Sequence, residues 1–191
     1  MNIATPNNGG GGGGGSDAAG PRILHDTDPI LVNLDVAVDS APEELRAGLE
    51  EIVRNHTVPY FRRADLGSEA QNTWLVGFER SDDIADGSYE ARTVASGDET
   101  QPRVLIRYRR AVDAFRALGQ VLTAARAAEL AADGGLLRPD FVITEKAQFE
   151  TLALMIDCSR NGVLGVKSVC AMLRSMALMG FNMLQLYTED T

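Results

Sequence analysis

The chain of 191 residues carries a formal net charge of −9 at pH 7, with 45% hydrophobic and 24% charged residues. This balance is typical of a globular protein rather than a disordered or membrane protein. The negative charge argues against nucleic acid as a partner, because phosphate binding needs clustered lysine and arginine. One basic cluster, which we interpret as a solvated face rather than an anion site, consists of Arg103, Arg107, Arg109 and Arg110.

The cysteines and histidines show no metal-ligand spacing, so we expect neither a metal ion nor another cofactor. The residues concerned are Cys158, Cys170, His25 and His56. Both cysteines lie in apolar runs, which favours buried thiols in a reducing compartment. We find no signal-peptide pattern and no run of about 18 apolar residues, so we expect a cytoplasmic protein that does not enter a membrane.

Residues 1–22 form a low-complexity segment with seven consecutive glycines from Gly9 to Gly15. Such a composition buries too little apolar surface to offset its ordering entropy, so we predict a disordered tail. A phosphate-binding loop is disfavoured, because no strand precedes the glycines and no Lys-Ser/Thr pair follows them.

Residues 23–138 show the alternating pattern of a half-buried strand over 32–38, followed by a capping-box spacing at Ser40–Glu43. A helix with one apolar stripe is expected next. Its apolar residues are Leu45, Leu49, Ile52 and Val53.

Three further strands are predicted over 73–79, 89–95 and 103–108, and a long helix over 111–131. The expected inward face of that helix consists of Val112, Phe115, Leu118 and Leu122. This order of elements predicts a non-catalytic α+β domain, with helices on one face of a mostly antiparallel sheet.

Residues 139–191 have a different pattern. The apolar run 149–158 is typical of a strand buried on both faces. A helix is predicted over 166–179, with Gly180 as its left-handed cap and a second strand over 181–187. The expected inward residues of this helix are Val169, Met172, Leu173, Met176 and Met179. Together these elements predict a parallel βαβ unit with a right-handed crossover.

Charged residues follow both strands of this unit, where parallel α/β folds place their active sites. They are Asp157 and Arg160 after the first strand, and Glu189 and Asp190 after the second. An arginine beside carboxylates suits a polyhydroxylated ligand, because donors and acceptors together can grip neighbouring hydroxyls. The alternative is that Asp157 and Arg160 form a salt bridge that closes the strand end, beside a solvated loop at Glu189 and Asp190.

The stretch from Leu152 to Thr191 resembles the start of the catalytic barrel in glycoside hydrolase family 20, the β-N-acetylhexosaminidases. In that family a hydrophobic strand ends in Asp-x-x-Arg, matched here by Asp157–Arg160. An Asn-x-Leu-x-Leu strand then ends in Ser/Thr-Asp-Asp, matched by 182–186 and 188–190. Two positions depart from the family pattern. Glu189 stands where the family usually has aspartate, and Gln185 stands where it frequently has histidine. These departures make the stretch resemble a divergent bacterial branch of the family.

The resemblance implies a (β/α)8 (TIM) barrel and a retaining exo-glycosidase that removes terminal β-linked N-acetylhexosamine from oligosaccharides or glycoconjugates. The substrate's own 2-acetamido group is the nucleophile in such enzymes. Arg160 would hold hydroxyls of the terminal sugar, and Asp190, Glu189 and Asp157 would support the sugar pocket. The acid/base glutamate and the aspartate that orients the acetamide would belong to a later strand, so no catalytic residue is expected in this chain.

Two strands cannot close a barrel, and their apolar sides would be left exposed. We therefore expect a fragment, the start of a truncated barrel, that hydrolyses nothing by itself. Two alternatives remain open. One is another barrel glycosidase or lyase with the same opening. The other is a non-catalytic α+β interaction module whose C-terminal βαβ unit completes its own sheet.

Overall fold

A computed structural model describes residues 32–55, 61–64, 73–95, 103–131, 140–159 and 162–189. The predicted tail 1–22, His25 and His56 lie outside these residues. The elements are β1 (Asn33–Val36), α1 (Glu43–Asn55), β2 (Phe61–Arg63), β3 (Thr73–Arg80), β4 (Ser88–Val94), β5 (Arg103–Tyr108), α2 (Ala111–Ala131), β6 (Val142–Lys146), β7 (Ala153–Asp157), α3 (Val166–Met179) and β8 (Met183–Tyr187). No described helix is both long and apolar enough to span a membrane.

Six strands form one mixed sheet in the order β2-β1-β3-β5-β4-β6. The pairs β1–β2, β1–β3 and β3–β5 are parallel, whereas β4 is antiparallel to both β5 and β6. The prediction of a mostly antiparallel sheet was therefore wrong. The parallel pair β1–β2 is possible because α1 carries the chain back between them, as parallel strands require.

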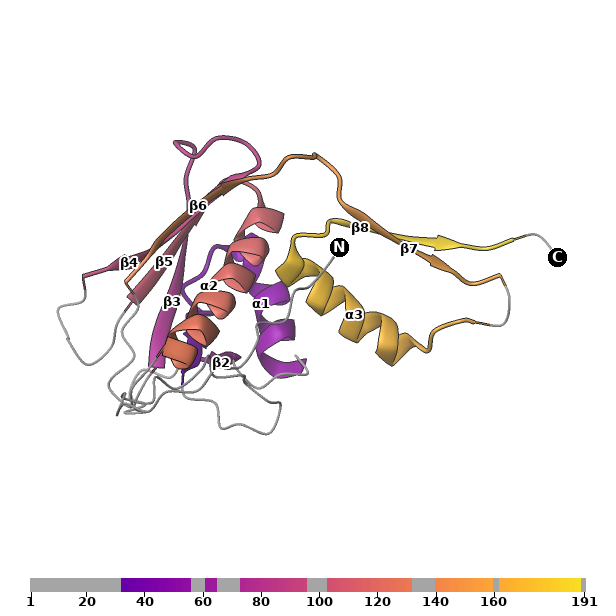
Figure 1. Ribbon diagram of the computed structural model, residues 1–191, viewed down its shortest axis with the longest axis horizontal. Coiled ribbons are helices and arrows are strands. Elements are labelled where there is room, and N and C mark those ends of the chain that lie inside the picture. Colours follow the sequence, from indigo (N-terminus) through magenta and orange to yellow (C-terminus); the bar gives the residue numbers. More distant parts are fainter. Residues whose placement is uncertain are drawn as a thin grey trace, which may run out of the picture.

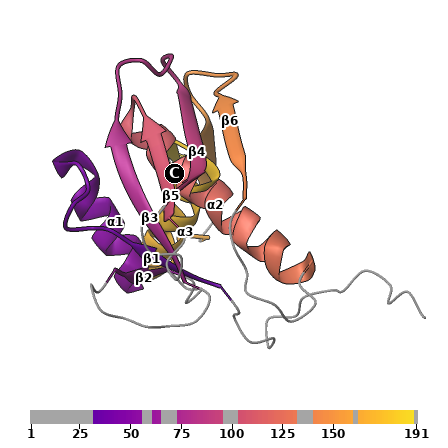
Figure 2. The same ribbon diagram turned by 90° about the vertical axis from the view of Figure 1, so that its left-hand side faces the viewer.

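The apolar stripes predicted for the first strand and helix form the centre of the core. Val32, Leu34, Val36 and Val38 are buried, as are Leu45, Leu49 and Ile52. Burying side chains of this size removes about 1.5–3 kcal/mol of unfavourable hydration each. Helices α1 and α2 cover one face of the sheet (Figure 1), while Figure 2 shows the strands with those helices behind them.

Helix α2 has the predicted bounds, but the predicted inward face was only partly right. Its buried apolar residues are Ala114, Ala117, Leu118, Val121 and Ala125. Phe115 and Leu122 are only partly buried against the core. Small side chains let this helix lie close to the sheet, and a second helix occupies its other side.

Strands β7 and β8 form a separate two-stranded parallel sheet with α3 between them in sequence. This confirms the predicted parallel pairing with a helix between the strands, whereas the right-handed crossover stays a prediction and the predicted burial of β7 on both faces was wrong. The separate sheet also contradicts the alternative in which the βαβ unit completes the first sheet. Gly180 ends α3 in the left-handed conformation, with φ 85° and ψ 12°, as predicted. The (β/α)8 barrel itself remains a proposal.

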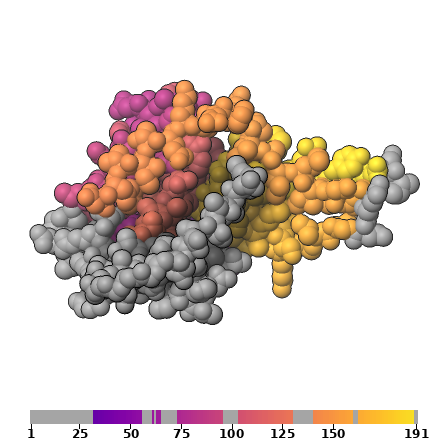
Figure 3. Space-filling view, in the orientation of Figure 1, coloured from indigo at the N-terminus to yellow at the C-terminus, as the bar shows by residue number. Residues whose placement is uncertain are grey.

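Helix α3 packs against α2 and α1, so the molecule has four successive layers: the large sheet, α1 with α2, α3, and the β7–β8 sheet (Figure 1). The predicted inward face of α3 was partly wrong, because Met176 and Leu178 are its buried residues whereas Met179 is 65% exposed. Burial is concentrated near the end of α3 that meets α2. Figure 3 shows the C-terminal segment projecting from the larger unit, which consists of the six-stranded sheet with α1 and α2.

Strand β6 was not predicted. It extends the large sheet by pairing with β4, so residues 142–146 belong to a sheet that the sequence analysis had ended before residue 139. The two cysteines are free and half-buried, not fully buried as predicted.

Candidate functional site

The carboxyl ends of β7 and β8 lie side by side, as predicted. Asp157 is paired in register with Tyr187, and the Cys158 N–H donates to the Tyr187 carbonyl oxygen at 2.8 Å. Both ends point away from the large sheet (Figure 1). Of the predicted site residues, Asp157 and the exposed Glu189 are described, whereas Arg160 and Asp190 lie outside the described residues. The predicted alternative, an Asp157–Arg160 salt bridge, therefore stays a prediction.

Asp157 is exposed but held in one orientation by Ser159. The Ser159 N–H donates to its Oδ1 at 2.7 Å, and the Ser159 hydroxyl donates to the same oxygen. These two bonds lower the pKa of Asp157 below its ordinary value, because they favour the ionised carboxylate. Asp157 is thus a charged acceptor whose Oδ2 takes part in neither bond.

One face of the β7–β8 sheet is entirely exposed. Successive residues alternate between the faces of a strand. Leu154, Ile156 and Leu184 are half-buried on one face, as expected where α3 covers the strands, whereas Leu186 on that face is 53% exposed. The opposite face carries Ala153, Met155, Asp157, Met183, Gln185 and Tyr187, all exposed.

Polarity changes along this exposed face. Ala153 and Met183 are paired at its start, Met155 and Gln185 in its middle, and Asp157 and Tyr187 at its carboxyl end. Barrel interiors have the same arrangement, with apolar packing layers below and functional groups at the carboxyl ends of the strands. The exposed face is therefore suited to be the inner wall of a larger sheet.

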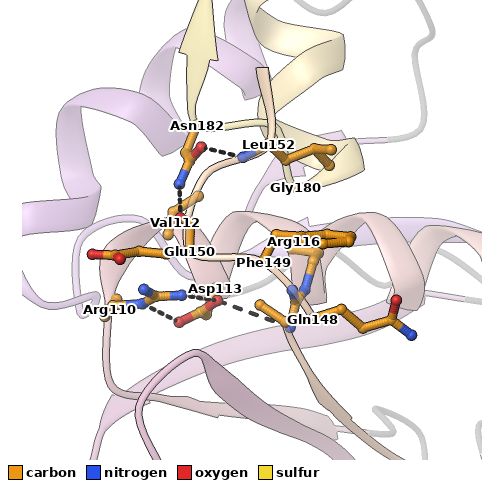
Figure 4. A pocket seen from close by; sticks show the side chains of 11 residues that line it. Arg110, Val112, Asp113, Arg116, Gln148, Phe149, Glu150, Leu152, Gly180 and Asn182 are labelled. Carbon is orange, nitrogen blue, oxygen red and sulfur yellow. Dashed lines mark hydrogen bonds and ion pairs between the residues drawn. The ribbon is translucent and has the colours of Figure 1, made fainter. Parts of the chain in front are cut away.

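A pocket of about 290 Å³ lies at the opposite end of β7 and β8, where they leave the larger unit (Figure 4). Asp113, only 2% exposed, accepts a hydrogen bond from Arg110 Nε at 3.0 Å. The Asn182 side chain accepts from the Leu152 N–H at 2.9 Å and donates to the Glu150 carbonyl at 2.8 Å. Because these polar groups satisfy one another, we interpret this junction pocket as a structural joint.

Two arginines of the basic cluster form ion pairs with carboxylates of the chain. Arg107 pairs with Glu79 at 3.2 Å, and Arg110 pairs with Asp113 and with Asp86. These pairs favour the predicted solvated face over an anion site. In the part of the chain that the structure describes, no three His, Cys, Asp or Glu side chains gather in a way that could hold a metal ion.

Tyr187 belongs to this candidate site by strand register and was not predicted from the sequence. It immediately precedes the polar residues that begin at residue 188. It lies two residues after Gln185, so both side chains are on one face of β8. Only the register with Asp157 reveals its neighbour on the other strand.

No protein-family model and no curated protein sequence matches the chain. Among solved structures, it is similar to the glycoside hydrolase family 20 exo-β-N-acetylglucosaminidase from Vibrio harveyi in complex with N-acetylglucosamine. That match has a TM-score of 0.52 and 17% identity, and covers 83% of this chain and 22% of the enzyme. An inactive mutant of that enzyme matches with TM-score 0.52 and 17% identity over 81% and 21%. The family 20 β-N-acetylhexosaminidase from Streptomyces coelicolor A3(2) matches with TM-score 0.48 and 18% identity over 82% and 30%.

The similarity shows that this chain has a fold like that of part of a family 20 enzyme. The chain spans only about a fifth of the length of the Vibrio enzyme. The match covers 83% of this chain, and the residues before β7 make up a smaller share than that. The match therefore includes residues from the C-terminal βαβ unit as well as from the larger unit.

Proposed function

We propose that the chain is the N-terminal part of a glycoside hydrolase that removes terminal β-linked N-acetylhexosamine by a retaining, substrate-assisted mechanism. The unit β7–α3–β8 is the start of its (β/α)8 barrel. The observation that carries this proposal is the exposed face of β7–β8, which is apolar at its start and polar at its carboxyl end. The similarity in fold to family 20 enzymes supports it.

In this proposal the chain supplies residues that bind the terminal sugar but not the groups that carry out its hydrolysis. The Asp157 carboxylate accepts hydrogen bonds from sugar hydroxyls, and Ser159 keeps it ionised and oriented. Arg160 donates to hydroxyls of the same sugar, and Glu189 and Asp190 line the pocket beside it. The acetamido oxygen of the substrate attacks its own anomeric carbon. The groups that orient the acetamide and protonate the leaving oxygen belong to a later strand.

A second candidate is another barrel glycosidase, since the same opening can serve different chemistry. The alternative of a non-catalytic module whose βαβ unit completes its own sheet is contradicted, because β7 and β8 form a separate sheet. Met155 and Met183 are 59% and 48% exposed on the same face, where a self-contained sheet would bury them.

Sugar titration into the ¹⁵N-labelled chain tests the proposal. We expect N-acetylglucosamine to shift amide signals of Asp157, Ser159, Tyr187 and Glu189, with an affinity on the order of millimolar because only part of a site is present. Signals of Arg110 and Asn182 at the junction pocket should stay in place. Shifts confined to the junction pocket would contradict the proposed site. Equal binding of glucose would favour another glycosidase.

A further inference from the structure

Tyr187 is the last residue of β8, and its aromatic side chain stands beside a carboxylate. Its register partner is Asp157, and adjacent strands lie about 4.8 Å apart. Paired residues of a parallel ladder point to the same face, so the ring and the carboxylate share the exposed face. The Tyr187 side chain is 42% exposed, whereas its carbonyl is held by Cys158. The backbone is thus fixed and the ring remains available.

Two neighbouring groups here differ in the chemistry that they offer. The Asp157 carboxylate has one oxygen bonded to Ser159, and Oδ2 accepts neither of those bonds. An aromatic face offers apolar contact area at low entropic cost, because few side-chain torsions must be fixed. A pyranose ring matches this pair, since its C–H groups form apolar faces and its hydroxyls form a polar rim.

We propose that Tyr187 is a further substrate-contacting residue, whose ring packs against the apolar face of the terminal sugar while Asp157 accepts a hydroxyl at its rim. The inference rests on the proposed function, and it adds the group that selects for a pyranose face. The contact is made by the ring, so the phenolic hydroxyl is not required. Gln185 lies on the same face nearer the start of β8. It therefore borders the proposed contact on the side away from the carboxyl end of the strand.

Four variants of the full chain test this role by titration with N-acetylglucosamine. Tyr187→Phe keeps the ring and should bind within about twofold of the parent. Tyr187→Ala and Tyr187→Leu remove the ring and should weaken binding by roughly three- to tenfold, the range expected for aromatic contact. Leu186→Ala is the matched control, because Leu186 lies next in sequence and points to the opposite face. Its affinity should stay near that of the parent.

Several results would overturn the role of Tyr187. These are unchanged affinity in Tyr187→Ala, equal losses in Tyr187→Phe and Tyr187→Ala, an equal loss in Leu186→Ala, or no sugar binding by the parent chain. Thermal unfolding and the amide spectrum establish that each variant is folded. If the other variants unfold, Tyr187→Phe alone decides whether the ring or the phenolic hydroxyl is needed for sugar binding. Glucose separates the two proposals. If it binds the parent as well as N-acetylglucosamine does, with the same dependence on Tyr187, the ring contact stands and the N-acetylhexosaminidase function fails.

Discussion

Gly119 in the middle of α2 lies directly against the backbone carbonyl of Leu178 in α3. A Cβ atom at Gly119 would overlap that oxygen, so the helices meet here at backbone distance. Gly180, immediately after α3, lies similarly close to the Arg116 side chain of α2. The larger unit therefore holds the βαβ unit through a contact that only glycine permits.

Gly119→Ala should destabilise the chain, although alanine normally favours a helix over glycine by about 1 kcal/mol. The added methyl group meets backbone that cannot move aside, so we expect a net loss of about 1–3 kcal/mol in a urea titration. Amides of β7 and β8 should exchange with deuterium faster. Gly48→Ala is the comparison, because its methyl group meets a side chain, the Phe115 ring, rather than backbone. A more stable Gly119→Ala variant would refute this contact.

The ion pair between α3 and α1 should make their docking depend on pH. Arg174 Nε donates to Glu51 Oε1 at 2.8 Å. The Arg174 guanidinium donates a further bond to the same oxygen, and these bonds together with one from Asn55 hold the pKa of Glu51 below its ordinary value of 4.5. A carboxyl whose pKa is lower in the folded state stabilises that state above the unfolded pKa, and the effect is lost as pH falls through the folded value.

Glu51→Gln should therefore reduce the free energy of unfolding at pH 7, and the difference from the parent should shrink below about pH 4.5. Denaturant titrations across this range measure it. In an Arg174→Gln background the same substitution should have much less effect, because the main partner is gone. A pH-independent difference between parent and Glu51→Gln would mean that the ion pair does not contribute.

Ser159→Ala should raise the pKa of Asp157 towards its ordinary value. The variant removes the hydroxyl donor, which is the largest cause of the lowered pKa, and keeps the backbone N–H. Carboxyl ¹³C chemical shifts of Asp157 followed against pH give the value. Ser175→Ala is the control, since Ser175 donates to Ala171 on α3, away from the site. An unchanged Asp157 titration would show that Ser159 does not orient the carboxylate.

Met155→Lys should reduce self-association of the isolated chain. Met155 is 59% exposed on the open face of β7, and exposed apolar patches promote association. Sedimentation velocity at several concentrations measures the change. Val142→Lys is a matched control, because Val142 is 69% exposed but lies on β6 in the large sheet. If both variants behave alike, the β7–β8 face is not the associating surface.

Local patterns predicted most helices and strands because they are written in neighbouring residues. The bounds of α2 and α3 and the left-handed Gly180 followed from periodicity and glycine placement. The alternation from Val32 to Val38 identified the buried side of β1. Three-residue β2 is too short to show a period, and β6 could not be assigned to its sheet because its partner β4 is about fifty residues away in sequence.

The wrong helix faces have a different cause. Helix α2 lies between the sheet and α3, so alanines are buried on it beside Leu118 and Val121, and Gly119 contacts α3. A search for large apolar residues chose Phe115 and Leu122, which are only partly buried. At the candidate site, chain order led to the prediction of Asp157 and Glu189, but only strand register shows that Tyr187 is paired with Asp157.

The most direct test is nitrophenol release from a 4-nitrophenyl β-N-acetylglucosaminide, measured for the 191-residue chain and for the product of its gene extended downstream. Our account predicts no release by the 191-residue chain. It predicts release by an extended chain that supplies an Asp-Glu pair at a later strand end, and loss of that activity on Asp157→Ala. Release by the 191-residue chain alone, or a folded extended chain that carries the pair and releases none, would contradict it.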